Sequence, residues 1–191
     1  MTTVYFVRHA ASDHAAQDER TRPLTPQGRE SCAQVCAVLR GRGITRVFSS
    51  PYCRAVDTVA PFAREAGLAV ETVEEFRERR VDSVWVEDFM GFCRRQWADF
   101  DYALSGGETL AQVQRRNVAA LHALLRRCAG ESIVIGTHGT ALSTVLNHYD
   151  SRFDFTHFCA LLPLMPCIVR LRFEGETWLD MARLDLPETE H

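Results

Sequence analysis

The chain has 191 residues, of which 46% are hydrophobic and 25% are charged, a composition typical of a globular protein with a sizeable core. Its net charge of −3 provides no general positive field, which argues against nucleic acid or a membrane surface as a partner. The chain has no signal-peptide pattern and no apolar stretch long enough to span a bilayer, and its seven cysteines form no CxxC pair, so we expect a cytoplasmic protein without a disulfide framework or a structural metal.

The first predicted element is a strand that ends in two basic side chains. Residues 4–7 (VYFV) are apolar and β-prone, and Arg8 and His9 follow them directly. Such groups are costly to bury without partners. The pair is therefore either a polar rim where the strand reaches solvent or the floor of an anion site, and the dipeptide alone leaves both interpretations open.

A helix, a strand and a second helix are predicted next. Thr25 is a suitable N-cap for a helix that has Pro26 in its first position. The segment ITRVFSS (44–50) is predicted to be a short strand, and the next helix begins near Pro51. Because Pro61 lacks an N–H group and its ring crowds the preceding turn, we expect a break or a fresh helical turn there.

A third strand is expected at 68–73 (LAVETV), and residues 77–107 then show no clear periodicity. We interpret 77–107 as a short, partly helical cap inserted between regular elements. Its scattered aromatic residues are expected to pack within the cap rather than to stack on bases. They are Trp85, Phe89, Phe92, Trp97, Phe100 and Tyr102.

The last third of the chain has clear periodicity. An amphipathic helix is predicted at 109–128, followed by a buried strand at 132–136 that leads directly into another helix. Residues 167–184 alternate in polarity, with Gly175 placed for the turn of a hairpin. Strands that alternate with helices predict an α/β fold of three α/β/α layers with a mostly parallel central sheet.

Basic groups follow three of these strands. In open α/β sheets ligands bind beyond the carboxyl ends of the strands, where helix N-termini such as that at Gly139 also offer backbone N–H groups to an anion. The shared position of these groups predicts an anion site at one edge of the sheet. The side chains concerned are those of Arg8, His9, Arg54 and His138.

Five motifs resemble, in order and spacing, those of the histidine phosphatase superfamily, which has the phosphoglycerate-mutase-like fold. The resemblance extends from residue 3 to about residue 183, and it implies one histidine phosphatase domain over 1–191 with the cap at about 77–107. The motifs are VRHAAS (7–12), SSPYCRAVDT (49–58), EFRER (75–79), GGET (106–109) and GTHGT (136–140).

The resemblance implies that His9 is the nucleophile that becomes phosphohistidine, and that Arg8, Arg54 and His138 bind the phosphate. These residue types suit the chemistry, because a guanidinium can hold two phosphoryl oxygens and nearby arginines keep a nucleophilic imidazole neutral. His138 would be more useful in its protonated form, as a further oxygen clamp.

Glu78 stands where phosphatases of this family keep the proton donor for the leaving group. It lies in a charged run that could equally be a solvated surface. Glu74, Glu75 and Glu108 compete with it for this role, and Glu108 could instead be a pocket residue or an acid near a helix N-terminus.

Several further residues bear on substrate binding. Ser12 is a candidate hydrogen-bond donor to the phosphate, and Gly139 is a candidate phosphate contact at a helix start. Ala15 stands where mutase-type members of the family carry an asparagine, which puts mutase-like substrate holding in doubt. Arg20 and Arg22 could contact a second anionic group.

The favoured function is a phosphomonoester hydrolase that acts through phosphohistidine on a small phosphorylated metabolite, with no cofactor and no metal. A cofactor-dependent phosphoglycerate mutase and a non-catalytic module that binds phosphorylated ligands are the alternatives. A metallohydrolase is disfavoured because no ligand cluster has a recognisable spacing. A small phosphate ester is the expected partner, with neither nucleic acid nor membrane, and a homodimer is an open expectation.

Overall fold

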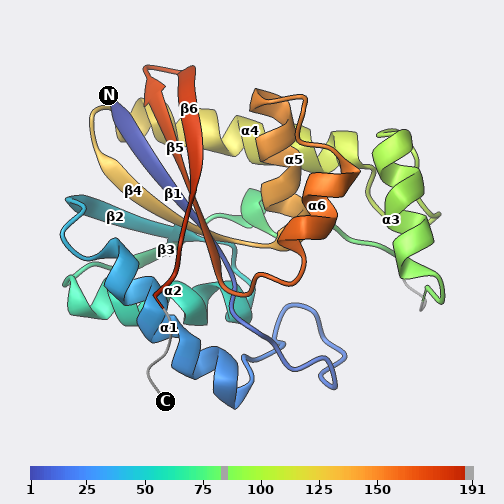
Figure 1. Cartoon of the computed structure of the whole chain (residues 1–191), viewed down its shortest axis with the longest axis horizontal. Helices are drawn as coiled ribbons and strands as arrows, with labels where there is room; N and C mark the ends of the chain where they lie inside the picture. Colours follow the sequence, from blue (N-terminus) through green and yellow to red (C-terminus); the bar gives the residue numbers. More distant parts are fainter. Residues whose placement is uncertain (83–85, 188–191) are drawn as a thin grey trace.

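The computed structural model of the protein describes residues 1–82 and 86–187 and contains a six-stranded sheet (Figure 1). The strand order is β3-β2-β4-β1-β5-β6. The neighbours from β3 to β1 pair in parallel, whereas β5 and β6 form an antiparallel hairpin added next to β1. The strands are β1 (Thr2–Arg8), β2 (Ile44–Ser49), β3 (Val70–Thr72), β4 (Ser132–Thr137), β5 (Cys167–Glu174) and β6 (Thr177–Leu184).

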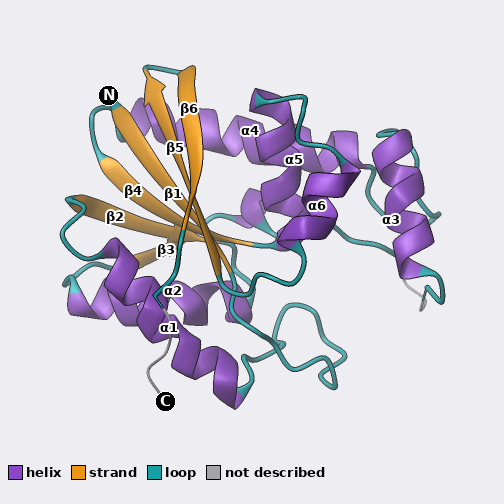
Figure 2. Ribbon diagram, viewed as in Figure 1, coloured by secondary structure: helices purple, strands orange, loops and turns teal. Residues whose placement is uncertain are grey.

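Helices cover both faces of the sheet, so the predicted three-layer α/β/α fold with a mostly parallel sheet is confirmed. Figure 2 shows α1 and α2 on one face and α4 and α5 on the other, and a buried apolar cluster fills each interface. The helices are α1 (Pro26–Leu39), α2 (Cys53–Glu65), the 3-10 helix η1 (Glu74–Phe76), α3 (Phe89–Ala98), α4 (Leu110–Arg127), α5 (Gly139–Tyr149) and α6 (Phe155–Leu161).

Local sequence signals fix several of these boundaries. Thr25 caps α1, because its hydroxyl accepts a hydrogen bond from the Gly28 N–H at 3.0 Å. Thr109 and Gln112 form a reciprocal capping box at the start of α4. Gly175 has a φ of 59°, a conformation that favours glycine, in the turn between β5 and β6. The predictions for Thr25 and Gly175 are confirmed, and the capping box at Thr109 is a further signal that the structure reveals.

The expected break at Pro61 is wrong, since α2 continues through it from Cys53 to Glu65. Proline removes the N–H group that would bond to the Asp57 carbonyl one turn earlier. In the structure the Cys32 thiol of α1 lies 3.8 Å from that carbonyl oxygen, but it lies closer, at 3.3 Å, to the Gly28 carbonyl of its own helix. Burial of Val59, Phe62 and Ala63 in an apolar cluster with α1 and the sheet keeps α2 continuous.

The segment 77–107 contains α3 and packs against a helix that the sequence analysis did not identify. The Trp97 ring of α3 lies 5.5 Å from the Phe158 ring of α6 and 6.2 Å from the Phe153 ring. Within the segment, the Phe92 ring lies 6.1 Å from the Tyr102 ring and the Trp97 ring 5.5 Å from the Phe100 ring, which agrees with the expectation that these aromatic residues pack within the cap. Trp85, which belonged to that expectation, lies outside the described residues.

No helix within the described ranges combines the length and the apolar character needed to cross a membrane.

The third strand is shorter than expected, with regular pairing limited to Val70–Thr72. The carboxyl ends of β1, β2 and β4 lie at the same edge of the sheet, where parallel pairing aligns Arg8 with Thr137 and Ser49 with Gly136. The predicted anion site belongs to this edge.

Candidate active site

His9 follows β1 directly and is held from two sides. Its backbone N–H donates to the Thr137 carbonyl at 3.0 Å, and its ring Nδ1 lies 2.7 Å from the Ala10 carbonyl oxygen. Because a carbonyl oxygen can only accept, Nδ1 carries the ring proton in the neutral form, and Nε2 keeps its lone pair. The fold therefore selects the ring nitrogen that is available as a nucleophile.

The charge state of His9 follows from its surroundings. The residue is 7% exposed, and burial together with the Arg54 charge lowers the pKa of His9 to about 3. Arg8 and Arg22 lower it further, whereas the bond to Ala10 acts in the opposite direction. The imidazole is therefore neutral near pH 7, as a nucleophilic nitrogen requires.

His138 is the N-cap residue of α5 and is fully buried. Its ring centroid lies 5.3 Å from that of His9, and its Nε2 lies 2.8 Å from the Ser50 hydroxyl. Burial, with Arg54 as the next cause, lowers the pKa of His138 well below its usual value. Desolvation and the neighbouring cations thus both oppose the protonated form in which His138 would be most useful as an oxygen clamp.

The Arg8 guanidinium is anchored beneath the pocket. Its Nη1 donates to the carbonyl oxygens of Leu161, Leu162 and Leu164, at 2.6, 2.9 and 3.1 Å, where α6 ends. Its Nε is buried without a hydrogen-bond partner among the described residues. A Cβ atom on Gly139 would lie 3.3 Å from that Nε, so glycine allows α5 to start close against the guanidinium.

Arg54 lies in the first turn of α2 and is 2% exposed. Its Nη1 and Nη2 donate to the backbone oxygen and the carboxylate of Glu19, at 2.5 and 3.0 Å. The Tyr52 ring lies beneath the Arg54 guanidinium and beside the His138 ring, at 5.1 Å in each case. Sequence reasoning missed Glu19, Tyr52 and Ser50, although the last two stand within the motif SSPYC.

Ser12 is 5% exposed, and its hydroxyl oxygen is buried without a hydrogen-bond partner in the described part of the chain. A short β-bridge between Ser12 and Leu24 positions the residue at the base of the loop that follows His9. An unsatisfied buried hydroxyl is costly. This position is compatible with the predicted hydrogen bond to a phosphate.

The Glu78 carboxylate lies at the N-terminus of α5, next to His138. One oxygen accepts hydrogen bonds from the backbone N–H groups of Arg79 and Ala141, at 2.7 and 3.1 Å. The other accepts from the Thr140 N–H at 3.0 Å. The structure thus places Glu78 at the same edge of the sheet as the two imidazoles.

Glu108, the strongest competitor of Glu78 for the role of proton donor, is held by arginine side chains. Hydrogen bonds join it to the Arg77 and Arg116 guanidinium groups and to the Arg80 N–H. Burial alone would raise the pKa of Glu108, but these bonds outweigh it and lower the pKa to about 2. Glu74 is likewise paired, with Arg20, at 2.8 Å.

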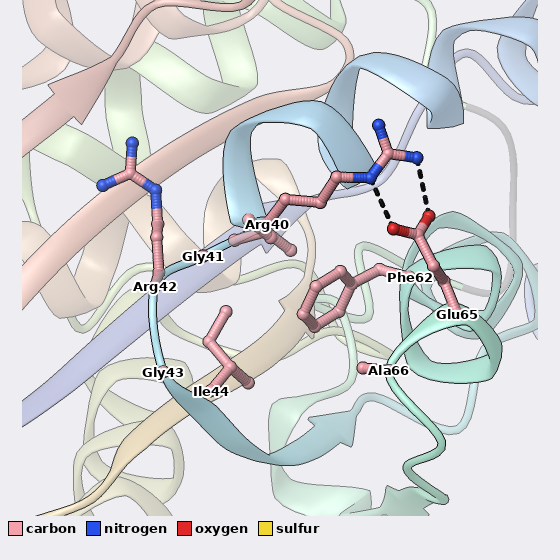
Figure 3. A pocket seen from close by; sticks show the side chains of 9 residues that line it. Arg40, Gly41, Arg42, Gly43, Ile44, Phe62, Glu65 and Ala66 are labelled. Atoms are coloured by element: carbon pink, nitrogen blue, oxygen red, sulfur yellow. Dashed lines mark hydrogen bonds and ion pairs between the residues drawn. The ribbon is translucent and has the colours of Figure 1, made fainter.

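The surface hollow in Figure 3 is not part of this edge. It lies at the opposite end of β2, where α1 ends and β2 begins, and the Arg40 guanidinium beside it is already paired with Glu65. Within 1–82 and 86–187, no three His, Cys, Asp or Glu residues converge on a point that could hold a metal ion. The positive charge of the site comes from arginine side chains.

The protein is thus an α/β protein in which two buried imidazoles and two buried guanidiniums gather at the carboxyl edge of a mostly parallel sheet. The sequence profile of the histidine phosphatase superfamily (branch 1) matches residues 4–182. The chain belongs to this family, as the five motifs implied.

The similar proteins include one named as a probable mutase and one named as a phosphatase. A probable phosphoglycerate mutase, GpmB, of Yersinia enterocolitica is 27% identical, over 98% of this chain and 97% of its own. YhfR of Bacillus stearothermophilus superposes with a TM-score of 0.80 at 22% identity, over 94% and 95% of the two chains. The mycobacterial glucosyl-3-phosphoglycerate phosphatase Rv2419c, with bound inorganic phosphate, gives 0.74 at 20% identity over 96% of each. The two structures share the fold.

Proposed function

We propose that this protein hydrolyses small phosphomonoesters through a phosphohistidine on His9, without a metal. The observation that carries the proposal is the state of the His9 ring. Its Nδ1–H is committed to the Ala10 carbonyl, and the lowered pKa leaves Nε2 unprotonated between two buried arginines. A neutral imidazole with one free nitrogen in a cationic pocket is suited to attack on phosphorus.

In the first step His9 Nε2 forms a bond to phosphorus while the bond from phosphorus to the ester oxygen breaks. Arg8, Arg54 and His138 stabilise the charge on the phosphoryl oxygens, with Ser12 and the start of α5 at Gly139 as further contacts. The charge of a phosphate dianion favours the protonated form of His138, in which the imidazole can donate to a phosphoryl oxygen. Glu78 donates a proton to the leaving oxygen.

In the second step water attacks the phosphohistidine, and the Glu78 carboxylate accepts the proton of that water. The bond between Nε2 and phosphorus breaks, inorganic phosphate leaves, and His9 returns to its neutral state. Three backbone N–H groups fix the position of the Glu78 carboxylate at the start of α5, which directly follows His138 in the chain.

Three features favour hydrolysis over phosphoglycerate mutase activity. The loop between Ser12 and Pro23 is short, and Ala15 provides no amide side chain to hold a substrate. The 77–107 segment, which we propose to be a cap on a single domain of 1–191, is also short. A mutase must keep water from its phosphohistidine while the product reorients, which requires a closed site. The name of the Yersinia relative favours the mutase, so the two activities need a direct comparison.

The test supplies purified protein with 3-phosphoglycerate and a catalytic amount of 2,3-bisphosphoglycerate, and measures inorganic phosphate and 2-phosphoglycerate together. We expect phosphate release to exceed mutase product. Efficient interconversion with negligible phosphate release would establish the mutase instead. An aryl phosphate is assayed in parallel, since binding without turnover of any ester would indicate a non-catalytic module.

A further inference from the structure

Glu19 is hydrogen-bonded to the Arg54 guanidinium through both its backbone and its side chain. Its backbone oxygen accepts a hydrogen bond from Nη1 at 2.5 Å, and its carboxylate accepts one from Nη2 at 3.0 Å. The other carboxylate oxygen contacts the Arg22 guanidinium. The Glu19 carboxylate thus bridges the two arginines and takes Nη2 of Arg54, one of the two terminal nitrogens through which Arg54 would hold phosphoryl oxygens, while the Glu19 backbone oxygen takes Nη1.

The two partners differ in their freedom to move. The Arg54 side chain is 3% exposed, within a helix, whereas the Glu19 side chain is 54% exposed, on a loop. The loop itself is anchored next to Glu19, because the Arg20 carbonyl accepts from the Cys53 N–H at 2.9 Å and the Arg20 guanidinium pairs with Glu74. The Glu19 side chain can therefore turn into water while both the loop and Arg54 stay in place.

We propose that Glu19 is an intramolecular competitor of the phosphoryl group for Arg54 and Arg22, and that it lowers the affinity of the pocket for phosphate. This inference rests on the proposed function of the site. A phosphate dianion carries more charge than one carboxylate, so it displaces Glu19 at the cost of breaking that contact. The larger the fraction of molecules in which Glu19 contacts Arg54, the lower the apparent affinity for phosphate. After hydrolysis, the returning carboxylate favours departure of inorganic phosphate.

The experiment measures binding of inorganic phosphate by titration calorimetry, which requires no turnover. We compare the unaltered protein with Glu19→Gln and Glu19→Ala, and with Glu75→Gln as the matched control. Glu75 is an exposed acid whose carboxylate has no contact within the described residues, so this control removes a negative charge without freeing Arg54. Circular dichroism checks that each variant is folded.

We expect Glu19→Gln and Glu19→Ala to bind phosphate about five- to tenfold more tightly, which corresponds to losing one partly exposed charged contact. Glu75→Gln should bind as the unaltered protein does. Unchanged or weaker binding by both Glu19 variants would overturn the inference and leave the proposed function standing. If Glu75→Gln tightened phosphate binding equally, net charge alone would explain the effect, and the inference about Glu19 would also be overturned. If no folded variant bound phosphate, the proposed function itself would fail.

Discussion

His9 and His138 face each other across the pocket, with ring centroids 5.3 Å apart and ring planes inclined by 62°. They come from segments almost 130 residues apart, yet β1 and β4 are paired neighbours and each imidazole directly follows its strand. Burial lowers the pKa of both rings. The pocket therefore keeps two neutral imidazoles among arginine charges until an anion enters.

This pair makes the stability of the protein depend on pH. Unfolded histidine has a pKa near 6.5, whereas the pKa of folded His9 is about 3, so unfolding takes up a proton between these values. The contribution of each such imidazole to the free energy of unfolding is fully present above pH 6.5. It falls as the pH decreases, by about 1.4 kcal/mol per pH unit. Urea unfolding between pH 7 and pH 5 should show this decline, and His9→Gln should flatten it by about one proton. An equal slope in the variant would contradict the assigned His9 environment.

The tautomer of His9 predicts the site of phosphorylation on the ring. Rapid quench with labelled aryl phosphate should trap phosphate on Nε2, because Nδ1 is committed to the Ala10 carbonyl. Phosphorus NMR of the denatured adduct distinguishes the two ring isomers. His9→Ala should lose both the label and turnover. Label on Nδ1, or labelling of His9→Ala, would show that the proposed nucleophile is wrong.

Glu78 and Glu108 should differ in how their effects depend on the leaving group. Glu78→Gln should slow hydrolysis of alkyl phosphates by about 10²–10⁴-fold and that of an aryl phosphate less, because a phenolate needs little protonation. Glu108→Gln should affect stability through Arg77 and Arg116, with the same effect on both ester classes. The reverse pattern would make Glu108 the acid.

Chelation tests the source of the positive charge. Aryl phosphate hydrolysis should persist at full rate in excess chelator, because arginines surround the proposed phosphoryl position. Arg54→Ala should lower kcat/KM by about 10²–10³-fold or more, the scale of a lost transition-state contact. A rate that falls on chelation and returns with magnesium or zinc would overturn the metal-free mechanism.

Gly28 links α1 to the loop after His9. A Cβ atom there would lie 2.1 Å from the Ala11 carbonyl oxygen, a backbone atom that cannot move alone. Gly28→Ala should therefore destabilise the protein by about 1–3 kcal/mol, even though alanine gains about 1 kcal/mol of helix propensity. Glu30→Ala, at an exposed position of α1, is the control for urea unfolding. If Gly28→Ala stabilised the protein, the backbone at Ala11 would have moved to accommodate the added Cβ atom, and the prediction would be wrong.

Local signals predicted the elements that carry the candidate site. The strand that ends in Arg8 and His9 and the strand that leads into His138 are short, strongly apolar segments, and parallel pairing brings their ends together. The sequence did not predict the contacts that depend on distant partners. Packing against α1 and the sheet holds α2 continuous through Pro61, and the Glu19 contact with Arg54 joins a loop to a helix 35 residues away. No periodicity in a sequence encodes such pairings.

The anchor of Arg8 has a consequence for the synthesis of the protein. Strand β1 emerges early from the ribosome, but its two neighbours in the sheet are β4 and β5, and the Arg8 guanidinium binds carbonyl groups 153 to 156 residues further along. A nascent chain therefore carries Arg8 long before the carbonyl groups that anchor its guanidinium exist. Contacts so distant in sequence slow folding. Phosphate-binding competence should accordingly appear late in translation, once β5 has left the exit tunnel.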